Sequence, residues 1–197
     1  MQSAPRGSLL PELSRPFAMP LRLPQEHNPA VHTLAEACAS AVVSGADADQ
    51  VHSCFRNFFG WADWSDGPSG AQFLRVSGAP TEVGARRNVV FAPDKNLHED
   101  LLAVDDVQRV TTYAGVNYGS LPTQPLTASP FPGPFLDYLS TVRVWPVTVT
   151  ADGKPAAFVS WSGTVWTDPS AVGAMTADLD AFYSGMLQKL QAHFAKQ

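Results

Sequence analysis

The last part of the chain, residues 170–195, carries the pattern that most limits the possible folds. Apolar residues recur there at intervals of three and four, which predicts one long amphipathic helix. Asp168 and Ser170 stand where they can cap its start. Because such a helix must bury its apolar stripe, the preceding chain has to provide one broad apolar surface. The stripe consists of Val172, Met175, Leu179, Phe182, Met186, Leu190 and Phe194.

That surface is predicted to be an antiparallel sheet, built from short strands that turn residues separate. Asp47 can cap a helix over residues 48–58, and a second short helix is expected before residue 72. The fold class is therefore α+β: a curved antiparallel sheet of about seven strands wrapped around the C-terminal helix, with two short helices after the first strand. Strands are expected at residues 37–44, 72–76, 85–91, 97–104, 108–116, 138–150 and 156–167.

Two proline-rich stretches stand apart from this pattern. Within residues 1–34, proline recurs every four to six positions up to Pro29, which excludes a helix of useful length. This segment is predicted to be an irregular arm that lies against a surface, with a flexible leader as the alternative. Residues 35–197 form the expected folded domain. Within it, the prolines of residues 117–137 predict a long loop, and loops of this length are often functional.

Composition excludes several classes of protein. Charged residues make up 16% of the chain and the net charge is −5, whereas a nucleic-acid-binding protein normally carries a basic patch. No stretch is long and apolar enough to predict a membrane-spanning helix. A secretory pattern is also missing, so a cytoplasmic location is expected, with organelle targeting by the basic start of the arm left open. The oligomeric state is not indicated.

Residue types that commonly hold metals or cofactors are few and scattered. Cys38 and Cys54 lack the spacing of a zinc site and are expected to be plain buried thiols, although a single bridge between them stays possible. The chain also has no glycine-rich phosphate loop between a strand and a helix. Neither a metal nor a cofactor is therefore predicted. The five histidines, which show no ligand spacing, are His27, His32, His52, His98 and His193.

Several short motifs occur in an order that resembles a known group of proteins. They are VHSCFRNFFGWADW at residues 51–64, G-x-x-R at 84–87, E-x-L at 99–101, V-x-W at 159–161 and FY at 182–183. Over residues 36–196, their spacing is similar to that of polyketide cyclase/dehydrase-type members of the START and birch-pollen-allergen superfamily, which have the helix-grip fold. The resemblance implies a concave, mostly apolar cavity between sheet and helix, which would take a hydrophobic small molecule.

Strand alternation predicts which side chains face that cavity. Arg87, Glu99, Tyr113 and Tyr138 fall on the more apolar faces of their strands, and Tyr183 joins them from the helix. Arg87 and Glu99 are expected to pair, either as a purely structural ion pair or as an anchor for a ligand oxygen. The residues expected to contact the ligand are Trp61, Trp64, Phe91, Tyr138, Trp161, Phe182 and Met186.

Three functions fit this pattern, and a binding module for an apolar or aromatic molecule is favoured. The alternative is a cofactor-independent cyclase, dehydratase or lyase, in which Glu99 acts as base and Tyr113 or Tyr183 as acid. Arg87 would stabilise an enolate or oxyanion. Asn96 replaces the acidic residue that the resemblance to cyanohydrin lyases implies, which weakens the lyase reading. A sensor whose 117–137 loop covers a bound ligand is the third possibility.

Overall fold

The computed structural model describes residues 32–65, 71–92, 95–116, 135–148, 150 and 153–197. Most of the arm and most of the 117–137 loop lie outside the described residues, so the expectations for both stay predictions. The elements in chain order are β1 (Thr33–Ser44), α1 (Ala48–Arg56), α2 (Ala62–Ser65), β2 (Gln72–Ser77), β3 (Arg86–Ala92), β4 (Lys95–Asp105), β5 (Val110–Val116), β6 (Phe135–Val147), β7 (Ala156–Thr167), the 3₁₀ turn η2 (Pro169–Ala171) and α3 (Val172–Ala195).

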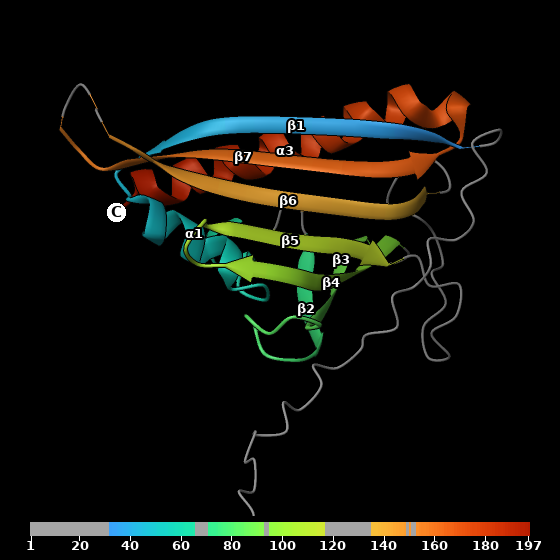
Figure 1. The fold of residues 1–197 in the computed structure, drawn as a ribbon, viewed down its shortest axis with the longest axis horizontal. Coiled ribbons are helices and arrows are strands. Elements are labelled where there is room, and N and C mark those ends of the chain that lie inside the picture. Colours follow the sequence, from blue (N-terminus) through green and yellow to red (C-terminus); the bar gives the residue numbers. More distant parts are fainter. Residues whose placement is uncertain (1–31, 66–70, 93–94, 117–134, 149, 151–152) are drawn as a thin grey trace, which may run out of the picture.

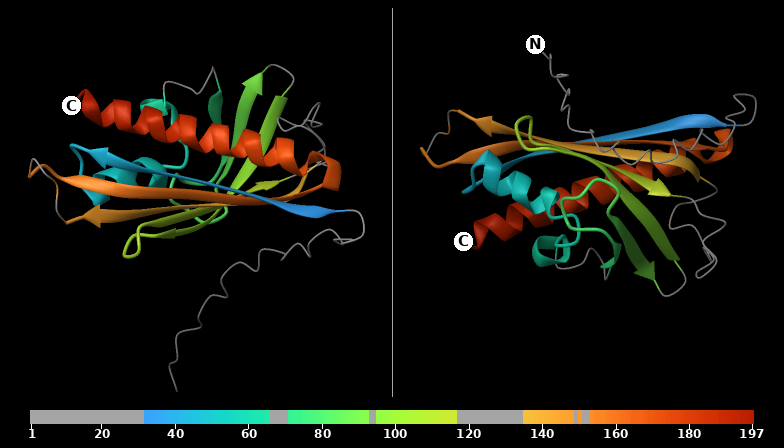
Figure 2. Two further views of the ribbon diagram at one scale, coloured as in Figure 1. Left: turned by 90° about the horizontal axis from the view of Figure 1, so that it is seen from above. Right: turned by 60° about the horizontal axis from the view of Figure 1, so that its bottom comes forward.

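In the described part of the chain, seven strands form one antiparallel sheet in the order β1–β7–β6–β5–β4–β3–β2. The sheet curves, and α3 crosses one of its faces (Figure 1). Seen from other directions, α1 and α2 lie on that same side of the sheet (Figure 2). This arrangement confirms the predicted fold class, including the long C-terminal helix and the two short helices after the first strand.

The strand boundaries differ from the predicted ones by a few residues. β1 begins at Thr33, four positions earlier than expected, because residues 33–36 continue the pairing with β7. β5 begins at Val110 because the preceding turn is longer than expected. There the Asp105 carboxylate accepts the N–H groups of Val107 and Gln108 at 2.9 and 2.8 Å, and Arg109 adopts a positive φ of 52°. β6 is displaced as a whole, to Phe135–Val147.

Helix α1 has the cap that the sequence predicts. The Asp47 carboxylate accepts the N–H of Gln50 at 2.8 Å, and the Gln50 side chain accepts the N–H of Asp47 at 2.9 Å, which completes a capping box. The helix ends at Arg56 and not at Phe58, because the Phe58 N–H turns away to the Pro80 carbonyl at 3.1 Å. The indole N–H of Trp64 donates a hydrogen bond to the Cys54 carbonyl at 3.3 Å.

The predicted capping of the C-terminal helix was wrong. Pro169 begins a 3₁₀ turn, α3 starts only at Val172, and no side chain caps either element. The apolar stripe is confirmed over most of its length, with Met175, Leu179 and Leu190 buried. Although α3 has 24 residues, no helix among the described residues is both long and apolar enough to span a membrane.

The edge strand β1 is tied to α3 by two polar side chains of the helix. Asp180 accepts the backbone N–H of Cys38 at 3.2 Å, and Gln191 donates to the carbonyl of Val42 at 2.8 Å. Cys38 itself is exposed, which corrects the prediction that both cysteines are buried: it lies on the face of β1 that points away from α3. Cys54 is half-buried, and both thiols are free.

Candidate ligand-binding site

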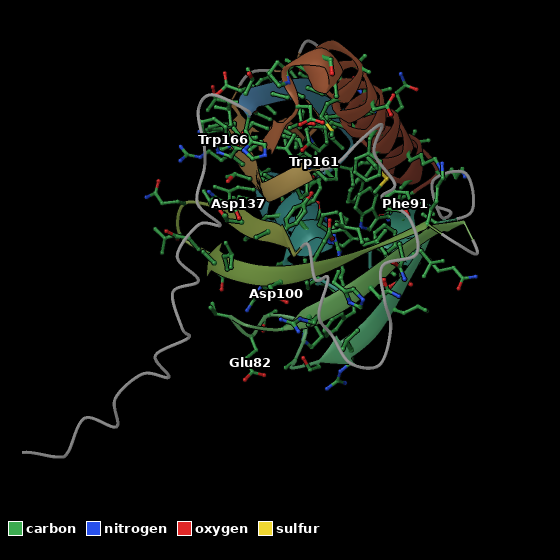
Figure 3. All side chains as sticks on the ribbon, turned by 90° about the vertical axis from the view of Figure 1, so that its right-hand side faces the viewer. Glu82, Phe91, Asp100, Asp137, Trp161 and Trp166 are labelled. Atoms are coloured by element: carbon green, nitrogen blue, oxygen red, sulfur yellow. The ribbon has the colours of Figure 1, made fainter. Side chains whose placement is uncertain are left out.

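The side chains predicted to face the helix do so. Arg87, Tyr113 and Tyr183 are fully buried, Tyr138 is 2% exposed and Glu99 is 5% exposed. The register explains why they meet, since Arg87 lies opposite Glu99 on β3 and β4, and Tyr138 lies opposite Gly115 on β5. In Figure 3, Trp161 and Phe91 lie on the same side of the sheet as α3. The alternation of the strands therefore brings one set of polar groups into the apolar interior.

Arg87 is enclosed by aromatic rings, and each of its three side-chain nitrogens has a hydrogen-bonding or ion-pair partner. Its Nε and Nη2 lie 2.6 Å from Oε2 of Glu99, and its Nη1 donates to the Phe58 carbonyl at 2.6 Å. The guanidinium carbon lies 3.7 Å from the ring centre of Trp61 and 4.0 Å from that of Phe58. Such stacking favours a cation that has left water. The contacts of Arg87 hold the Glu99 carboxylate in place, and they also fix the segment after α1 through Phe58.

Glu99 is the carboxylate of this interior, and opposing effects act on it. Burial raises the pKa of Glu99, while the charge of Arg87 and its hydrogen bond lower it. Burial and, to a smaller extent, the negative charge of Glu99 raise the pKa of Tyr113, Tyr138 and Tyr183. The paired Arg87 and Glu99 add no net charge to the interior.

The three tyrosine hydroxyls are linked to one another. Tyr138 Oη lies 2.9 Å from Tyr183 Oη and 3.4 Å from Tyr113 Oη. The indole N–H of Trp161 donates to Tyr113 Oη at 3.1 Å and to Ser140 Oγ at 2.9 Å. Burial is the main reason that the pKa of each tyrosine is raised, to about 12 for Tyr183. The phenols are therefore neutral at pH 7 and can both donate and accept hydrogen bonds.

Two glycines make room for these tyrosines. A Cβ built on Gly163 of β7 would overlap the Tyr183 hydroxyl and lie 3.0 Å from its Cζ. A Cβ on Gly115 of β5 would lie 2.6 Å from Cδ1 of Tyr138. Side chains at either position would displace a tyrosine, so the missing methyl groups let both phenols lie directly against the sheet.

Aromatic rings surround the hydroxyl groups. The rings of Trp161 and Tyr183 stack with centres 5.1 Å apart and an angle of 22° between their planes. Trp161 also meets Trp61 edge-on at 5.3 Å. At the other end of the cluster, Phe91 from β3 and Phe182 from α3 are half-buried, with ring centres 6.0 Å apart. The two parts of the cluster therefore differ: rings around Trp161 fill its middle, and the end at Phe91 and Phe182 is partly open to solvent.

The structure brings most of the predicted residues together, but not all of them. Trp64 packs 5.9 Å from Trp61 and 5.4 Å from Phe55, on the side away from the tyrosines. Met186 is buried in the core under α3. Sequence reasoning missed the contribution of Phe58 and of Ser140, whose hydroxyl donates to the Ser162 carbonyl at 3.1 Å. The parity of Ser140 with Tyr138 could have pointed to it.

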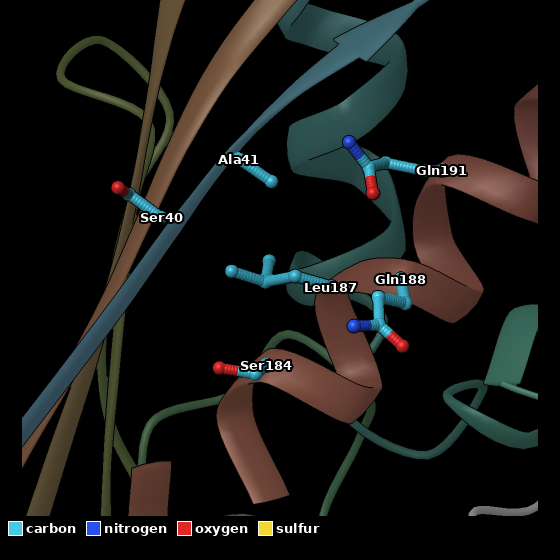
Figure 4. A pocket seen from close by; sticks show the side chains of 6 residues that line it. All are labelled: Ser40, Ala41, Ser184, Leu187, Gln188 and Gln191. Atoms are coloured by element: carbon cyan, nitrogen blue, oxygen red, sulfur yellow. The ribbon is translucent and has the colours of Figure 1, made fainter. Parts of the chain in front are cut away.

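A groove of about 270 Å³ lies elsewhere, between β1 and α3 (Figure 4). Its lining is mixed polar and apolar and contains none of the predicted site residues. The hollow expected beneath α3 would border on the 117–137 loop, most of which lies outside the described residues, so that hollow stays a prediction. The lining residues of the groove are Ser40, Ala41, Ser184, Leu187, Gln188 and Gln191.

Among the described residues, no group of three or more His, Cys, Asp or Glu side chains could hold a metal ion. The polar groups that meet around Tyr113 and Tyr138 include one ion pair, three phenols, the Trp161 indole N–H and the Ser140 hydroxyl. Chemically, such a set can bind oxygen atoms of a ligand and exchange protons with it.

A curved antiparallel sheet around a C-terminal helix, with polar groups set in an aromatic interior between them, defines the helix-grip class of proteins. Residues 36–195 match the family described as "Polyketide cyclase / dehydrase and lipid transport". The chain belongs to this family. A comparison of the sequence with curated proteins found no match.

Solved structures share the fold. A protein from Nitrosospira multiformis is 27% identical, with a TM-score of 0.59, over 81% of this chain and 95% of that one. An uncharacterised protein from Bacillus thuringiensis is 24% identical, with a TM-score of 0.61, over 82% and 99%. Norcoclaurine synthase from Thalictrum flavum is 17% identical, with a TM-score of 0.58, over 84% and 96%. These likenesses confirm the helix-grip fold.

Proposed function

We propose that the protein binds an uncharged, largely aromatic small molecule between α3 and the β3–β7 part of the sheet. The observation that carries the proposal is the linked row of phenols, Tyr113, Tyr138 and Tyr183, inside a cluster of aromatic rings. Hydroxyl groups in an apolar surrounding favour a ligand that is mostly hydrocarbon and has one or two oxygen atoms. The family description, which includes lipid transport, supports ligand binding in general.

The charge of the interior supports an uncharged ligand. Arg87 is neutralised by Glu99, and both of them are almost completely buried. A carboxylate or ammonium group on the ligand would therefore lose its water, and this described ion pair offers it no free partner of opposite charge. A carbonyl or hydroxyl group would lose less and could hydrogen-bond to a neutral phenol.

Phe91 and Phe182 support an entrance at the open end of the cluster. Like Phe59, they are half-buried, but these two rings contact each other from opposite layers, β3 and α3. An aromatic ligand would first contact these two rings and then reach Trp161, whose ring centre lies 5.9 Å from that of Phe182. Both rings can turn about their side-chain bonds without breaking a hydrogen bond.

A pair of fluorescent probes tests this proposal. N-phenyl-1-naphthylamine is neutral and aromatic, whereas 8-anilinonaphthalene-1-sulfonate adds a negative charge to a similar ring system. We expect saturable binding of the neutral probe and weaker binding of the sulfonate. Phe182→Glu should weaken binding of the neutral probe about tenfold or more, because it places a charge at the entrance.

The matched control is Phe158→Glu, because Phe158 is also half-buried but packs against Trp145 on the opposite face of the sheet. It should leave probe binding unchanged. If the wild type does not bind the neutral probe, or if both variants bind it equally well, the proposed site is wrong. Native mass spectrometry of the protein isolated from its own host would then identify any molecule that it does carry.

A second candidate is a cofactor-independent enzyme, and the burial of the Glu99 carboxylate in the same interior as three phenols favours it. Glu99 would accept a proton from the carbon next to a ligand carbonyl, the C–H electron pair would form the enolate, and a neutral tyrosine would donate a hydrogen bond to its oxygen. Each side-chain nitrogen of Arg87 already contacts Glu99 or Phe58, so its role would be to hold Glu99 in place. A norcoclaurine synthase structure with dopamine and hydroxybenzaldehyde shows that the related fold can hold aromatic molecules.

Hydrogen exchange separates the two candidates. An enzyme of this kind should replace the methyl hydrogens of acetophenone by deuterium in D₂O, which NMR measures. Glu99→Gln should abolish that exchange and keep the binding of the neutral probe, because the amide cannot act as base. If the wild-type protein gives no exchange above the buffer rate but binds the probe normally, the enzyme candidate is excluded and only the binding function remains.

A further inference from the structure

The sheet face that points away from α3 carries buried polar groups. On β3 and β4, Asn88 and His98 lie opposite each other in the register, and both alternate with the inward-facing Arg87 and Glu99. They therefore project from the outer face. Even so, Asn88 is only 7% exposed and His98 only 3%. No described helix or strand lies over this face, because all three helices lie on its other side (Figure 2).

These groups lack hydrogen-bond partners. Oδ1 of Asn88, Oδ1 of Asn96 and both ring nitrogens of His98 are buried without one. Burial is the main reason that the pKa of His98 is lowered, so the ring is neutral and has one donor and one acceptor nitrogen. The cluster thus needs donors for two amide oxygens and one nitrogen, and an acceptor for the other nitrogen. A polypeptide backbone offers N–H and C=O groups side by side, which matches this need.

Apolar side chains border the polar cluster on the same face. Leu74 on β2 lies opposite Asn88 and is 46% exposed. Leu139 on β6 is 42% exposed. It pairs with Ala114 of β5, which pairs with Asp100 of β4, two positions along that strand from His98. Buried amide and imidazole groups beside exposed leucines suit an extended, apolar peptide better than a charged ligand.

Residues 1–31 start from the correct end of the sheet to supply that peptide. Thr33, where β1 begins, pairs with Thr167, which pairs with Phe135 at the start of β6. His98 pairs with Val116 at the end of β5, so His98 lies at this same end. Four strand spacings of about 4.8 Å separate β1 from β4, or roughly 19 Å, which about six extended residues can cross.

The composition of this segment fits the surface. Its prolines prevent internal helix or sheet pairing, so its backbone groups are left for other partners. By the crossing distance, residues 21–27 would reach β4, and they include Leu21 and Leu23. Other large apolar residues of the segment include Leu9, Leu10, Leu13, Phe17 and Met19.

We propose that residues 1–31 of the same chain dock on the outer face of β2–β6, where the arm covers Leu74 and Leu139 and its backbone pairs with Asn88, Asn96 and His98. The arm would then stabilise this half of the sheet from its outer face. Because this surface lies on the opposite side of the sheet from the aromatic cluster, the proposal is independent of the proposed ligand.

Diethyl pyrocarbonate, which reacts with accessible imidazole nitrogens, tests this docking in the full chain. Peptide mass spectrometry gives the reaction rate of His98 in the native protein and in urea. We expect His98 of the wild type to react at least about tenfold more slowly than in urea, and Leu21→Ser/Leu23→Ser to remove most of that protection. Circular dichroism verifies that the variant keeps its fold.

A second variant tests a different cover. Leu121→Ser/Leu126→Ser changes two leucines of the 117–137 loop in the same way and should leave His98 protected. The proposal is overturned if the loop variant exposes His98 and the arm variant does not, or if wild-type His98 already reacts as fast as in urea. Protection that increases with protein concentration would also overturn it, since the arm would then come from a second copy.

Discussion

Gly163→Ala tests how closely the helix and the sheet approach each other at the candidate site. The added methyl group would overlap the Tyr183 hydroxyl and crowd Cζ at 3.0 Å. Tyr183 would have to move away from Trp161 and would lose its 2.9 Å hydrogen bond to Tyr138. Overpacking and the lost hydrogen bond together should lower the free energy of unfolding by about 2–4 kcal/mol.

Urea denaturation measures that loss, and thermal melting should show it as a decrease of about 2–4 °C for each kcal/mol. Gly185→Ala in α3 is the control, because a Cβ there meets nothing within 4 Å. It should stabilise the protein by about 0.5–1 kcal/mol, as alanine favours a helix over glycine.

A double-mutant cycle isolates the contact. Tyr183→Phe removes the hydroxyl that the new methyl group would meet, so Gly163→Ala should cost at least about 1 kcal/mol less in that background. The reasoning is refuted if Gly163→Ala is neutral, or if it costs the same with Tyr183 and with phenylalanine. Either result would mean that the Tyr183 hydroxyl does not lie against β7.

Three further predictions concern buried and exposed titratable groups. Arg87→Met should cost about 3–5 kcal/mol in urea denaturation because Glu99 is left unpaired, and Arg87→Met/Glu99→Leu should regain most of it; equal losses would contradict the pairing. Because burial lowers the pKa of His52, stability should be full above about pH 6.5 and decrease below it, where the unfolded chain binds the proton more readily. His52→Gln should flatten that slope between about pH 5 and 6.5, and an unchanged slope would exclude His52 as a source. Cys38 is exposed, whereas burial raises the pKa of Cys54 to about 11, so a thiol reagent at about pH 8 should react first with Cys38. Cys38→Ser should remove the fast phase, and a fast phase that persists would contradict the assignment.

Local sequence rules predicted the fold and the direction of the polar side chains well. The period of two in the strands placed Arg87 and Glu99 on the inner face, and the structure confirms both positions and their pairing. The capping box at Asp47 was also predictable, because it depends on residues only three positions apart.

Features that depend on contacts between distant segments could not be predicted in this way. The stacking of Phe58 on Arg87 joins a helix end to a strand, and nothing within either segment indicates it. Cys38 is exposed because its face of β1 points away from α3, and the direction of that face depends on contacts of β1 with the distant β7 and α3. The predicted caps of the C-terminal helix failed because Pro169 starts a 3₁₀ turn ahead of α3.

The hydrogen bonds from α3 to β1 also bear on self-association. An edge strand with free N–H and C=O groups can recruit a strand from another molecule, which is a common first step toward fibrils. On β1, Asp180 and Gln191 already occupy the backbone groups of Cys38 and Val42. The helix that covers the interior thus also hinders the addition of a strand at β1, and the six-residue β2 is the other edge of the described sheet.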